Sequence, residues 1–575
     1  MARSAKPSRP ARSSDGEPAP VAVSTKKTAL PLAVRVRPWL LLALSAVLMF
    51  LGFAGFGIWP LAFVGIIPAL FVFDPLETRG GFERPAGKWF FWRALFFGYL
   101  AELGGFYWLV TTLVDFSGFP LVICLLFGSI FFLFQGLQFV AILALWARAR
   151  ARGFSATPAL VAAYLASEAV FPMLFEHYYG SAFHPVPLLM QVADLGGPMM
   201  CTALAMIVAG ALYDVGSAAT RARGTLLSRI PRLWPSIALA YLLFAIGYGA
   251  FRLAQVDAMI AEAPHLTVGV VQTNMGLFEK WESPATGVRR HVEQTQQIAE
   301  RHDPDLVVWP ESAVTYFLPG DLQNLRQWPW ARRLGLDEVN VPIVFGALRQ
   351  RRTDDGREVD RNTAFLAGAD GTILGTYDKT YLLAFGEFIP FGETFPVLYD
   401  ISPMSGRFTP GDDPAPVIFP ARDGREYRLS ILVCYEDIVS AFVREAVGAG
   451  DPHLLVNITN DSWFGDTQEP WVHLNLARFR AVEHRRYLIR ATNSGVSAIV
   501  DAAGRLTEHS GVFVRANLVG EVAMLEGPPT LYGMVGAWPG WLALLSILLM
   551  GFLPERFLPR RRHRSALDEP VRDSH

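Results

Sequence analysis

Cysteine and charged residues are both scarce in this sequence of 575 residues. It contains three cysteines, Cys124, Cys201 and Cys434, and no Cys-x-x-Cys pair, which argues against a disulfide framework and a paired-cysteine zinc or redox site. Charged residues make up 18% of the chain, and the formal net charge is −1. Bulk electrostatics therefore give no reason to expect nucleic-acid binding.

Hydrophobic residues are abundant instead, at 52% of the chain, and the mean hydropathy is +0.29. This composition is too apolar for a soluble protein and indicates a membrane protein that carries a soluble part. The length leaves room for more than one domain. Cys124 and Cys201 lie within apolar runs, so Cys434 is the only cysteine of the soluble part.

Long apolar runs define the membrane part. A helix needs about 20 apolar residues to cross the hydrocarbon of a bilayer. The first run is too long, and too closely followed by a second, to be a cleaved signal peptide; Glu168 interrupts the fifth. We predict seven transmembrane helices within 38–256 and an eighth downstream, at about 39–55, 57–74, 89–112, 119–147, 157–175, 187–213, 234–253 and 535–553.

The distribution of Lys and Arg predicts the orientation. Residues 1–37 are basic and lack an apolar period, which is typical of a disordered tail, and 554–575 are basic as well. The loops after the second, fourth and sixth runs carry Lys or Arg, whereas the loops near Asp115 and across 176–187 carry none. By the positive-inside rule, both tails are cytoplasmic and the segment 264–527 lies on the opposite side.

Segment 264–527 alternates between strand-like and helical patterns, which predicts an α/β domain. Asp370-Gly371 and Asp423-Gly424 are typical of hairpin turns. We expect helices at 288–302 and 471–490, and strands at 265–273, 305–309, 341–348, 429–433, 453–459, 495–500 and 517–525.

Three stretches of this segment carry reactive side chains: Glu311 in VVWPES, Lys379 in YDKTYLLAFGEFIP and Cys434 in LSILVCYEDI. Taken alone, each has an ordinary interpretation, namely a solvated carboxylate, a solvated lysine or a packed thiol. Together they suit thiol chemistry. A buried glutamate can accept the thiol proton, and an ammonium group can lower the thiol pKa and stabilise an oxyanion.

The order and spacing of these residues resemble the Glu–Lys–Cys triad of the nitrilase, or carbon–nitrogen hydrolase, superfamily. The gaps are 68 residues (379 − 311) and 55 residues (434 − 379). Over roughly 39–553 the chain resembles one membrane-bound branch, the apolipoprotein N-acyltransferases, and FGEFIPFGE, NDSWFG and TNSG are further family-like pieces. The resemblance implies an α+β membrane protein with eight transmembrane helices and a nitrilase-like α-β-β-α sandwich domain at 264–527.

The resemblance also implies a two-step acyl transfer that needs no cofactor. Glu311 would take the proton of Cys434, Cys434 would attack the sn-1 ester of a phospholipid, with phosphatidylethanolamine as the expected donor, and Lys379 would stabilise the oxyanion. The thioester would then pass its acyl chain to the α-amino group of the diacylglyceryl-modified N-terminal cysteine of an apolipoprotein. The expected setting is a monomer in the bacterial inner membrane, with the catalytic domain in the periplasm.

Other residues are expected to support this site or to line the path of the substrate. An acyl chain in water costs about 0.8 kcal/mol per CH₂, so a lipid-fed site should lie just above the bilayer with aromatic loops directed toward it. Ordinary packing is an equal alternative for each aromatic residue. The predicted supporting residues are Glu387, Tyr435 and Glu436, and the predicted substrate-binding residues are Trp281, Phe385, Phe388, Trp463 and Phe464.

Two other classes of function fit part of the sequence. A membrane-tethered amidase would use the same triad, with water in place of the amine as the second nucleophile. A scaffold or transporter with a degenerate soluble domain would have lost part of the triad, and all three residues are present. His453, His473 and His484 show no metal-ligand spacing, so we predict no metal site.

Overall fold

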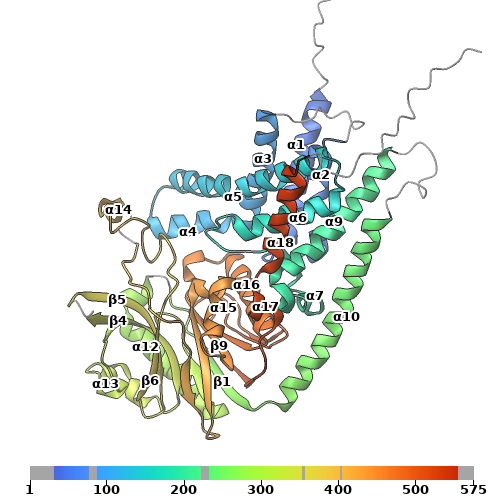
Figure 1. Cartoon of the computed structure of the whole chain (residues 1–575). Coiled ribbons are helices and arrows are strands. Elements are labelled where there is room, and N and C mark those ends of the chain that lie inside the picture. The colour runs from blue at the N-terminus through green and yellow to red at the C-terminus, as the bar shows by residue number, and fades with distance from the viewer. Residues whose placement is uncertain are drawn as a thin grey trace, which may run out of the picture.

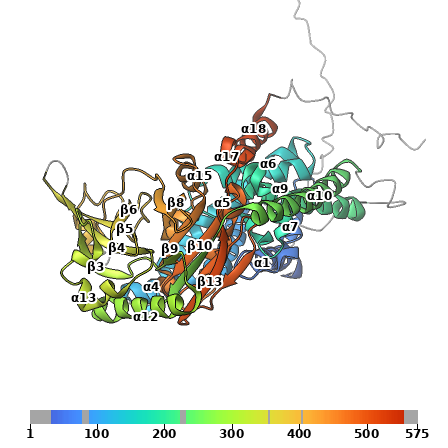
Figure 2. The ribbon, with the colours of Figure 1, turned by 90° about the horizontal axis from the view of Figure 1, so that it is seen from below.

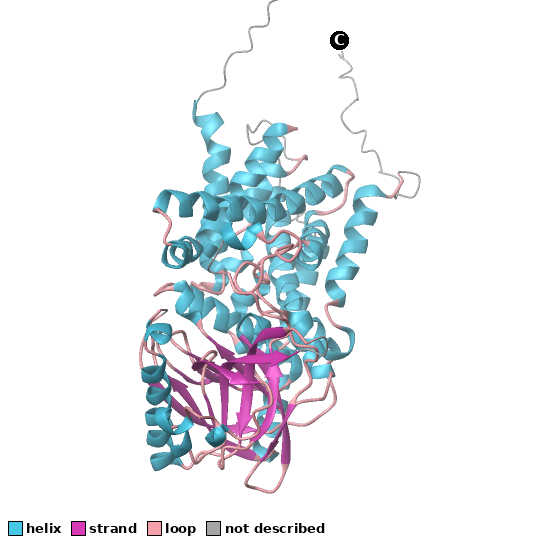
Figure 3. Cartoon of the chain, turned by 90° about the vertical axis from the view of Figure 1, so that its left-hand side faces the viewer, coloured by secondary structure: helices cyan, strands magenta, loops and turns pink. Residues whose placement is uncertain are grey.

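The computed structural model describes residues 32–76, 87–221, 232–276, 278–352, 356–401 and 405–554. Most of the predicted tails 1–37 and 554–575 therefore lies outside the described residues, as do Arg79, Arg84, Arg223 and Arg229 of the basic loops. The described chain has two parts, a bundle of helices and a domain built around two sheets (Figure 3). The first helix begins at Leu32, inside the range predicted as a tail.

The helical part contains every element before residue 263 and the last two helices of the chain. It begins at α1 and ends at α18, and the long α10 leads from it to the sheets (Figure 1). Its elements are α1 (Leu32–Gly52), η1 (Trp59–Phe63), α2 (Ile67–Phe73), α3 (Lys88–Phe106), α4 (Trp108–Ser117), α5 (Leu121–Ala151), α6 (Ala156–Val170), η2 (Tyr179–Phe183), α7 (Pro187–Met190), α8 (Ala193–Gly196), α9 (Pro198–Arg221), α10 (Leu233–Glu262), α17 (Leu531–Val535) and α18 (Trp538–Phe552).

Four of the described helices, α1, α5, α9 and α10, are long and apolar enough to cross a membrane. A fifth candidate span is the pair α3 and α4, which bends by 61°. The remaining predicted spans correspond to shorter apolar helices at Trp59–Phe73, Ala156–Val170 and Trp538–Phe552. Proline explains part of this shortening, because Pro60 and Pro68 each stand in the first turn of a short helix and Pro172 follows the end of α6. The prediction of eight spans is therefore not confirmed: the described residues contain four candidate spans, or five if α3 and α4 form one.

The second part consists of two packed sheets. The first has the order β13 (Ala516–Ala523), β1 (His265–Gln272), β2 (Leu306–Val308), β4 (Ile343–Arg352), β5 (Glu358–Ala367) and β6 (Ile373–Asp378), with β3 (Val314–Pro319) paired to β4. The second has the order β12 (Leu506–His509), β11 (Ala498–Val500), β10 (Tyr487–Thr492), β9 (Leu454–Thr459), β8 (Glu426–Val433) and β7 (Val417–Pro420).

Alternating side chains of the strands build separate cores on the two faces of each sheet. Val270 of β1 packs between the sheets with Ile431 of β8, whereas the next residue, Val271, packs beneath α12 (Pro284–His302). The second sheet is covered by α15 (Ser440–Gly448) and α16 (Glu469–His484). Figure 2 shows α12 along the outer side of the first sheet. The order of layers is α-β-β-α, as predicted.

The helix predicted at 471–490 is too long. It ends at His484, and Arg485 adopts a left-handed conformation at the C-cap, after which Tyr487 begins β10. Both elements are buried, so their side chains give no amphipathic period that would separate helix from strand. Strands β3 and β12 were also not predicted, whereas the two hairpins at Asp370 and Asp423 form as β5–β6 and β7–β8.

Helix α16 lies between the second sheet and the helical bundle. All of its residues except Trp471 are buried. Its Asn475 side chain donates a hydrogen bond to the carbonyl of Ala54 (2.9 Å), and Phe479 packs into the core of the bundle. Just beyond the helix, Arg485 forms an ion pair with Asp194 of α8. These contacts hold the sheets directly against the bundle.

Candidate active site

Three strand ends bring the predicted triad to one place. Glu311 follows β2, Lys379 immediately follows β6, and Cys434 immediately follows β8. Cys434 has a φ of +53°, a conformation that non-glycine residues seldom adopt. The chain turns there from β8 into the short helix η6 (Cys434–Asp437). This turn places the thiol at the strand end, where a nucleophile is accessible.

Glu311 and Lys379 are joined through Glu387 and Asn362. Lys379 Nζ lies 2.7 Å from Glu387 Oε2 and 4.0 Å from Glu311 Oε1. The Asn362 amide donates to Glu311 Oε1 (2.7 Å) and to Glu387 Oε1 (3.0 Å). Glu387 Oε2 also accepts from the backbone N–H of Leu383 (2.9 Å). One ammonium group and one amide therefore fix the positions of both carboxylates.

The turn that carries Glu311 requires a glycine on the neighbouring strand. A Cβ added at Gly346 of β4 would lie 2.6 Å from the nitrogen of Ser312 and 2.7 Å from Cα of Glu311. Ser312 itself has a φ of +52°. The backbone of the Glu311 turn thus passes directly over Gly346, and any larger residue there would displace it.

The charges of the triad act on the cysteine. Burial raises the pKa of the Cys434 thiol well above its usual value, the Glu311 carboxylate raises it further, and the Lys379 ammonium lowers it. The Thr459 side chain also lowers the pKa of this thiol. The free thiol is consequently protonated near neutral pH, and it needs a base before it can attack.

Glu311 has the properties of that base. Burial raises its pKa above the ordinary value, against the lowering effect of Lys379, and Glu387 raises it further. Burial lowers the pKa of Lys379, but Glu387, Cys434 and Glu311 outweigh this effect and raise it. Lys379 therefore stays charged, while Glu311 is adjusted toward accepting a proton.

Glu436 joins the Cys434 strand end to the Lys379 loop. Burial raises its pKa to about 7, although Lys379 and several hydrogen bonds lower it. It is fully buried and is positioned by four donors from both segments. These donors are the backbone N–H groups of Val433 (2.7 Å), Thr380 (2.8 Å) and Tyr381 (2.8 Å) and the Tyr377 hydroxyl (2.8 Å).

Known proteins match both parts of the chain. The carbon–nitrogen hydrolase family model matches residues 267–522, and the model of the apolipoprotein N-acyltransferase N-terminal domain matches residues 45–211. The apolipoprotein N-acyltransferase of Geobacter metallireducens is 30% identical over 88% of this chain and 94% of its own length. The chain belongs to the apolipoprotein N-acyltransferase family.

Other relatives agree with this assignment. The apolipoprotein N-acyltransferase of Azotobacter vinelandii is 31% identical over 92% of this chain and 96% of its own length, and that of Pseudomonas aeruginosa is 30% identical over 91% and 98%. Among solved structures, an amidase of the nitrilase superfamily from Nesterenkonia is 22% identical, with a TM-score of 0.33, and covers 46% of this chain and 93% of its own.

The aromatic residues predicted to bind substrate fall into two groups. Trp281, in α11 (Glu279–Glu282), and Phe385 are exposed, and Phe388 and Trp463 are partly exposed. Phe464 is instead buried and packs edge-on against Trp108 of α4, with ring centroids 5.1 Å apart. The contact of Phe464 therefore lies between the sheet domain and the helical bundle. A role in substrate binding stays a prediction for all five aromatic residues.

Tyr435, predicted as a supporting residue, makes a second connection to the helical bundle. Its hydroxyl donates a hydrogen bond to the carbonyl of Leu174 (2.5 Å), and its ring packs against Phe175 at a centroid distance of 6.2 Å. Because Tyr435 is the residue after Cys434, the helical part of the chain is in contact with the turn that carries Cys434.

Two further features were not predicted from the sequence. Lys280 is buried, and burial lowers its pKa to about 8, while Glu311 and Cys434 raise it, so a second ammonium group lies beside the site. Arg490 of β10 is also fully buried and forms ion pairs with Asp437 (2.6 Å) and Asp461 (3.0 Å). In the sequence, Arg490 stood at the end of the helix predicted at 471–490, and nothing there indicated a buried ion-pair network.

His473 completes that network. Its Nε2 lies 2.8 Å from Asp437 and its Nδ1 lies 3.1 Å from Asp461, and burial and Arg490 lower its pKa, but the two aspartates raise it to about 10. Asp461, Glu469 and His473 also lie close enough together to hold a metal ion. The contacts of His473 with two carboxylates match a buried imidazolium.

Proposed function

We propose that this protein transfers the sn-1 acyl chain of a phospholipid, through a thioester on Cys434, to the α-amino group of a diacylated apolipoprotein. Phosphatidylethanolamine is the proposed donor, and the proposed working form is a monomer. The supporting observation is the convergence of Glu311, Lys379 and Cys434 from three strand ends into one site, where the charges of Glu311 and Lys379 act on the thiol. This geometry provides a base, a fixed cation and a nucleophile.

In the first step the Cys434 proton moves to Glu311 and the thiolate attacks the ester carbonyl carbon. The resulting oxyanion is stabilised by the Lys379 ammonium and by the backbone N–H of Tyr435, at the start of η6. Glu387 holds Lys379 in position at 2.7 Å. When the tetrahedral intermediate collapses, the C–O bond breaks, the lysophospholipid leaves with the proton from Glu311, and the acyl group remains on sulfur.

In the second step the neutral α-amine of the lipoprotein attacks the thioester carbonyl. The nitrogen passes its surplus proton to Glu311, the C–S bond breaks, and the proton returns to the sulfur of Cys434. The covalent intermediate divides one difficult transfer into two easier ones. Water in the place of the amine would make the same site a hydrolase, so exclusion of water from the thioester decides between the two outcomes.

Exposed hydrophobic residues support access from a lipid phase. The arm between Lys379 and α14 (Val397–Ile401) extends to the side of α4 and α5 (Figure 1). Exposed hydrophobic surface of this kind marks an interaction site. The large exposed hydrophobic side chains of the arm are Tyr381, Phe385, Phe391, Phe395 and Val397, of which Phe391 is 76% exposed.

The same arrangement supports a multi-pass protein of the bacterial inner membrane with its catalytic domain in the periplasm. We propose eight membrane passages, in which the three shorter helices complete the bundle. Arg148 donates to the carbonyl of Gly551 (2.8 Å), and Arg150 pairs with Asp74 (2.8 Å), so the ends of α5, α18 and α2 form one basic region. By the positive-inside rule this region faces the cytoplasm.

The direct test supplies the purified protein, in phosphatidylethanolamine vesicles, with a diacylated lipopeptide whose α-amine is free. The expected result is a lipopeptide heavier by one acyl chain, together with one lysophospholipid for each product, measured by mass spectrometry. A lipopeptide with an acetylated α-amine is the control and should gain no mass. Release of free fatty acid, or of ammonia from small amides, without any acylated lipopeptide would contradict the transferase and favour a hydrolase.

A further inference from the structure

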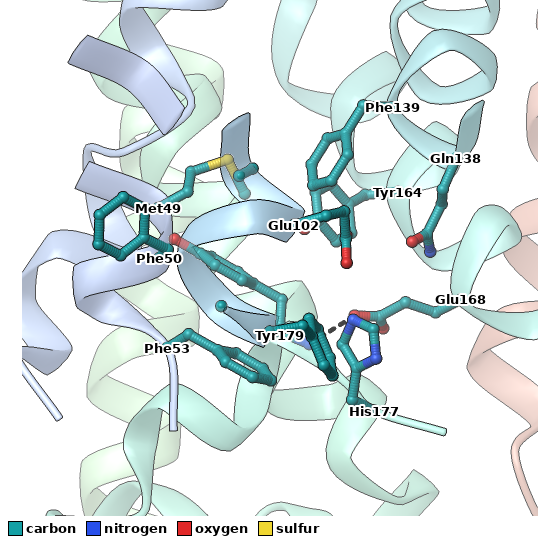
Figure 4. A pocket seen from close by; sticks show the side chains of 13 residues that line it. Met49, Phe50, Phe53, Glu102, Gln138, Phe139, Tyr164, Glu168, His177 and Tyr179 are labelled. Carbon is teal, nitrogen blue, oxygen red and sulfur yellow. Dashed lines mark hydrogen bonds between the residues drawn. The ribbon is translucent and has the colours of Figure 1, made fainter. Parts of the chain in front are cut away.

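A cavity of about 40 Å³ lies inside the helical bundle, apart from the triad. Figure 4 shows that its side chains come from several helices and point into one space. Since one water needs about 10–15 Å³ by this measure, the cavity has room for a small polar group. Among the residues that line it are Phe50 within α1, Phe53 just after α1, Glu102 of α3, Glu168 of α6 and His177.

Two carboxylates of this cavity are more than nine-tenths buried: Glu102 is 4% exposed and Glu168 is 7% exposed. Glu168 Oε1 accepts from the backbone N–H of Tyr179 (2.8 Å) and from the Thr202 hydroxyl (3.1 Å), but its Oε2 has no hydrogen-bond partner. Glu102 Oε2 also has none within the described residues. The Tyr179 hydroxyl, in the same wall, is a third buried polar atom without a partner there.

A cationic hydrogen-bond donor fits the unpartnered carboxyl oxygens of this site. No Lys or Arg is among the lining residues, and an isolated carboxylate inside a membrane domain is costly unless it meets a positive charge or a proton. The remaining walls include the rings of Phe53, Phe106 and Tyr164, and aromatic faces attract ammonium groups. A phosphate or a carboxylate group would be repelled by the same two acids.

We propose that this cavity binds the primary ammonium group of an amphiphile, held between Glu102 and Glu168. A chain of aromatic contacts connects the cavity to the catalytic cysteine. Phe106, which lines the cavity, lies 6.5 Å from Phe175, measured between ring centroids, and Phe175 packs on Tyr435, next to Cys434. The cavity is therefore a holding site for a substrate amine at the bundle side of the catalytic centre.

Two sources of this amine follow from the proposed function, on which their naming rests: the ethanolamine head group of the phospholipid donor and the free α-amino group of the lipoprotein acceptor. Both are amphiphiles with a primary ammonium.

The experiment uses the full-length Cys434→Ser variant in phosphatidylglycerol nanodiscs, so that no ammonium lipid competes and binding is measured without acyl transfer. If the wild type fails to transfer acyl chains while the Cys434→Ser variant still binds an ammonium probe, the proposed function is contradicted and this inference stands.

Four diazirine-labelled probes are compared: phosphatidylethanolamine against phosphatidylglycerol, and a diacylated lipopeptide with a free α-amine against its acetylated form. Cross-linked peptides are identified by mass spectrometry. At least one ammonium probe should label the cavity-lining peptides about tenfold more than the matched probe that lacks the ammonium group, as expected for a charge-assisted hydrogen bond. The pair that shows the difference identifies the source as the donor lipid or the acceptor.

The double variant Glu102→Gln, Glu168→Gln should remove this preference. The matched control is Asp214→Asn, because Asp214 is another buried carboxylate of the bundle, bonded to the Thr157 hydroxyl (2.8 Å) and absent from the cavity wall; it should leave the labelling unchanged. Equal labelling by the probes with and without an ammonium group in both pairs, or a preference that survives the double variant, would overturn the proposal. The probe comparison decides the question even if the double variant fails to fold.

Discussion

Replacing Glu311 with Gln is expected to slow the acylation of Cys434 by about 10²–10⁴-fold, the usual contribution of a general base. Burial and the Glu311 carboxylate keep the pKa of the Cys434 thiol high, so the thiol cannot ionise without a nearby acceptor for its proton. A glutamine has almost the same shape and can still accept the hydrogen bond from Asn362 (2.7 Å), but it cannot take up the proton.

The measurement is the rate at which a fluorescent acyl chain passes from a phospholipid to the protein. Glu445→Gln is the matched control, because this carboxylate is exposed on α15 and the same substitution there should leave the rate unchanged. Cys434→Ala sets the baseline, because a variant without the thiol should acquire no fluorescent acyl chain. Acylation of Glu311→Gln at the wild-type rate would show that another group is the base.

The second large effect concerns stability. Replacing Arg490 with Leu is expected to destabilise the sheet domain by roughly 3–5 kcal/mol, as for removal of one partner from a buried ion pair. Arg490, Asp437 and Asp461 are all fully buried, so the substitution leaves two carboxylates without their main counter-charge. Because Asp461 follows β9 beside the Cys434 turn, the loss also reaches the catalytic site.

This prediction is checked by unfolding the purified variants in detergent and comparing their midpoints. Arg422→Leu is the control, since Arg422 is about half exposed and pairs with Asp303 and Asp305 at the surface, where the loss should be at most about 1 kcal/mol. Adding Asp437→Asn and Asp461→Asn to Arg490→Leu should restore part of the stability. Equal midpoints for Arg490→Leu and Arg422→Leu would refute the account of the buried network.

Much of the sheet domain could be predicted because its signals are local. Asp370-Gly371 fixes a hairpin through turn geometry alone, and β1, with the sequence HLTVGVVQ, is a short segment rich in valine. The boundary between α16 and β10 could not be predicted in this way. Both elements are enclosed by the bundle and the sheet, so buried residues such as Phe479 and Ile489 carry no periodic contrast with solvent.

The reactive groups of the candidate site could be predicted from the sequence, but only some of the residues that hold them in place could. The motifs around Glu311, Lys379 and Cys434 stand out by residue type and position. Asn362 and Lys280 lie in stretches with no distinguishing pattern, and only the fold shows that they reach the site. The membrane part shows the same limit, because the apolar run that contains Pro60 and Pro68 suggests one long helix, and the prolines divide it into two short ones.

The most direct test of the central claim is the mass of the peptide that contains Cys434 after the protein has been incubated with phospholipid alone. The expected result is a gain of one acyl chain on that peptide, removed by hydroxylamine as a thioester requires, with no gain on peptides containing Cys124 or Cys201. An unmodified Cys434 peptide, in a preparation that still acylates lipopeptide when the acceptor is added, would contradict a thioester intermediate on this residue.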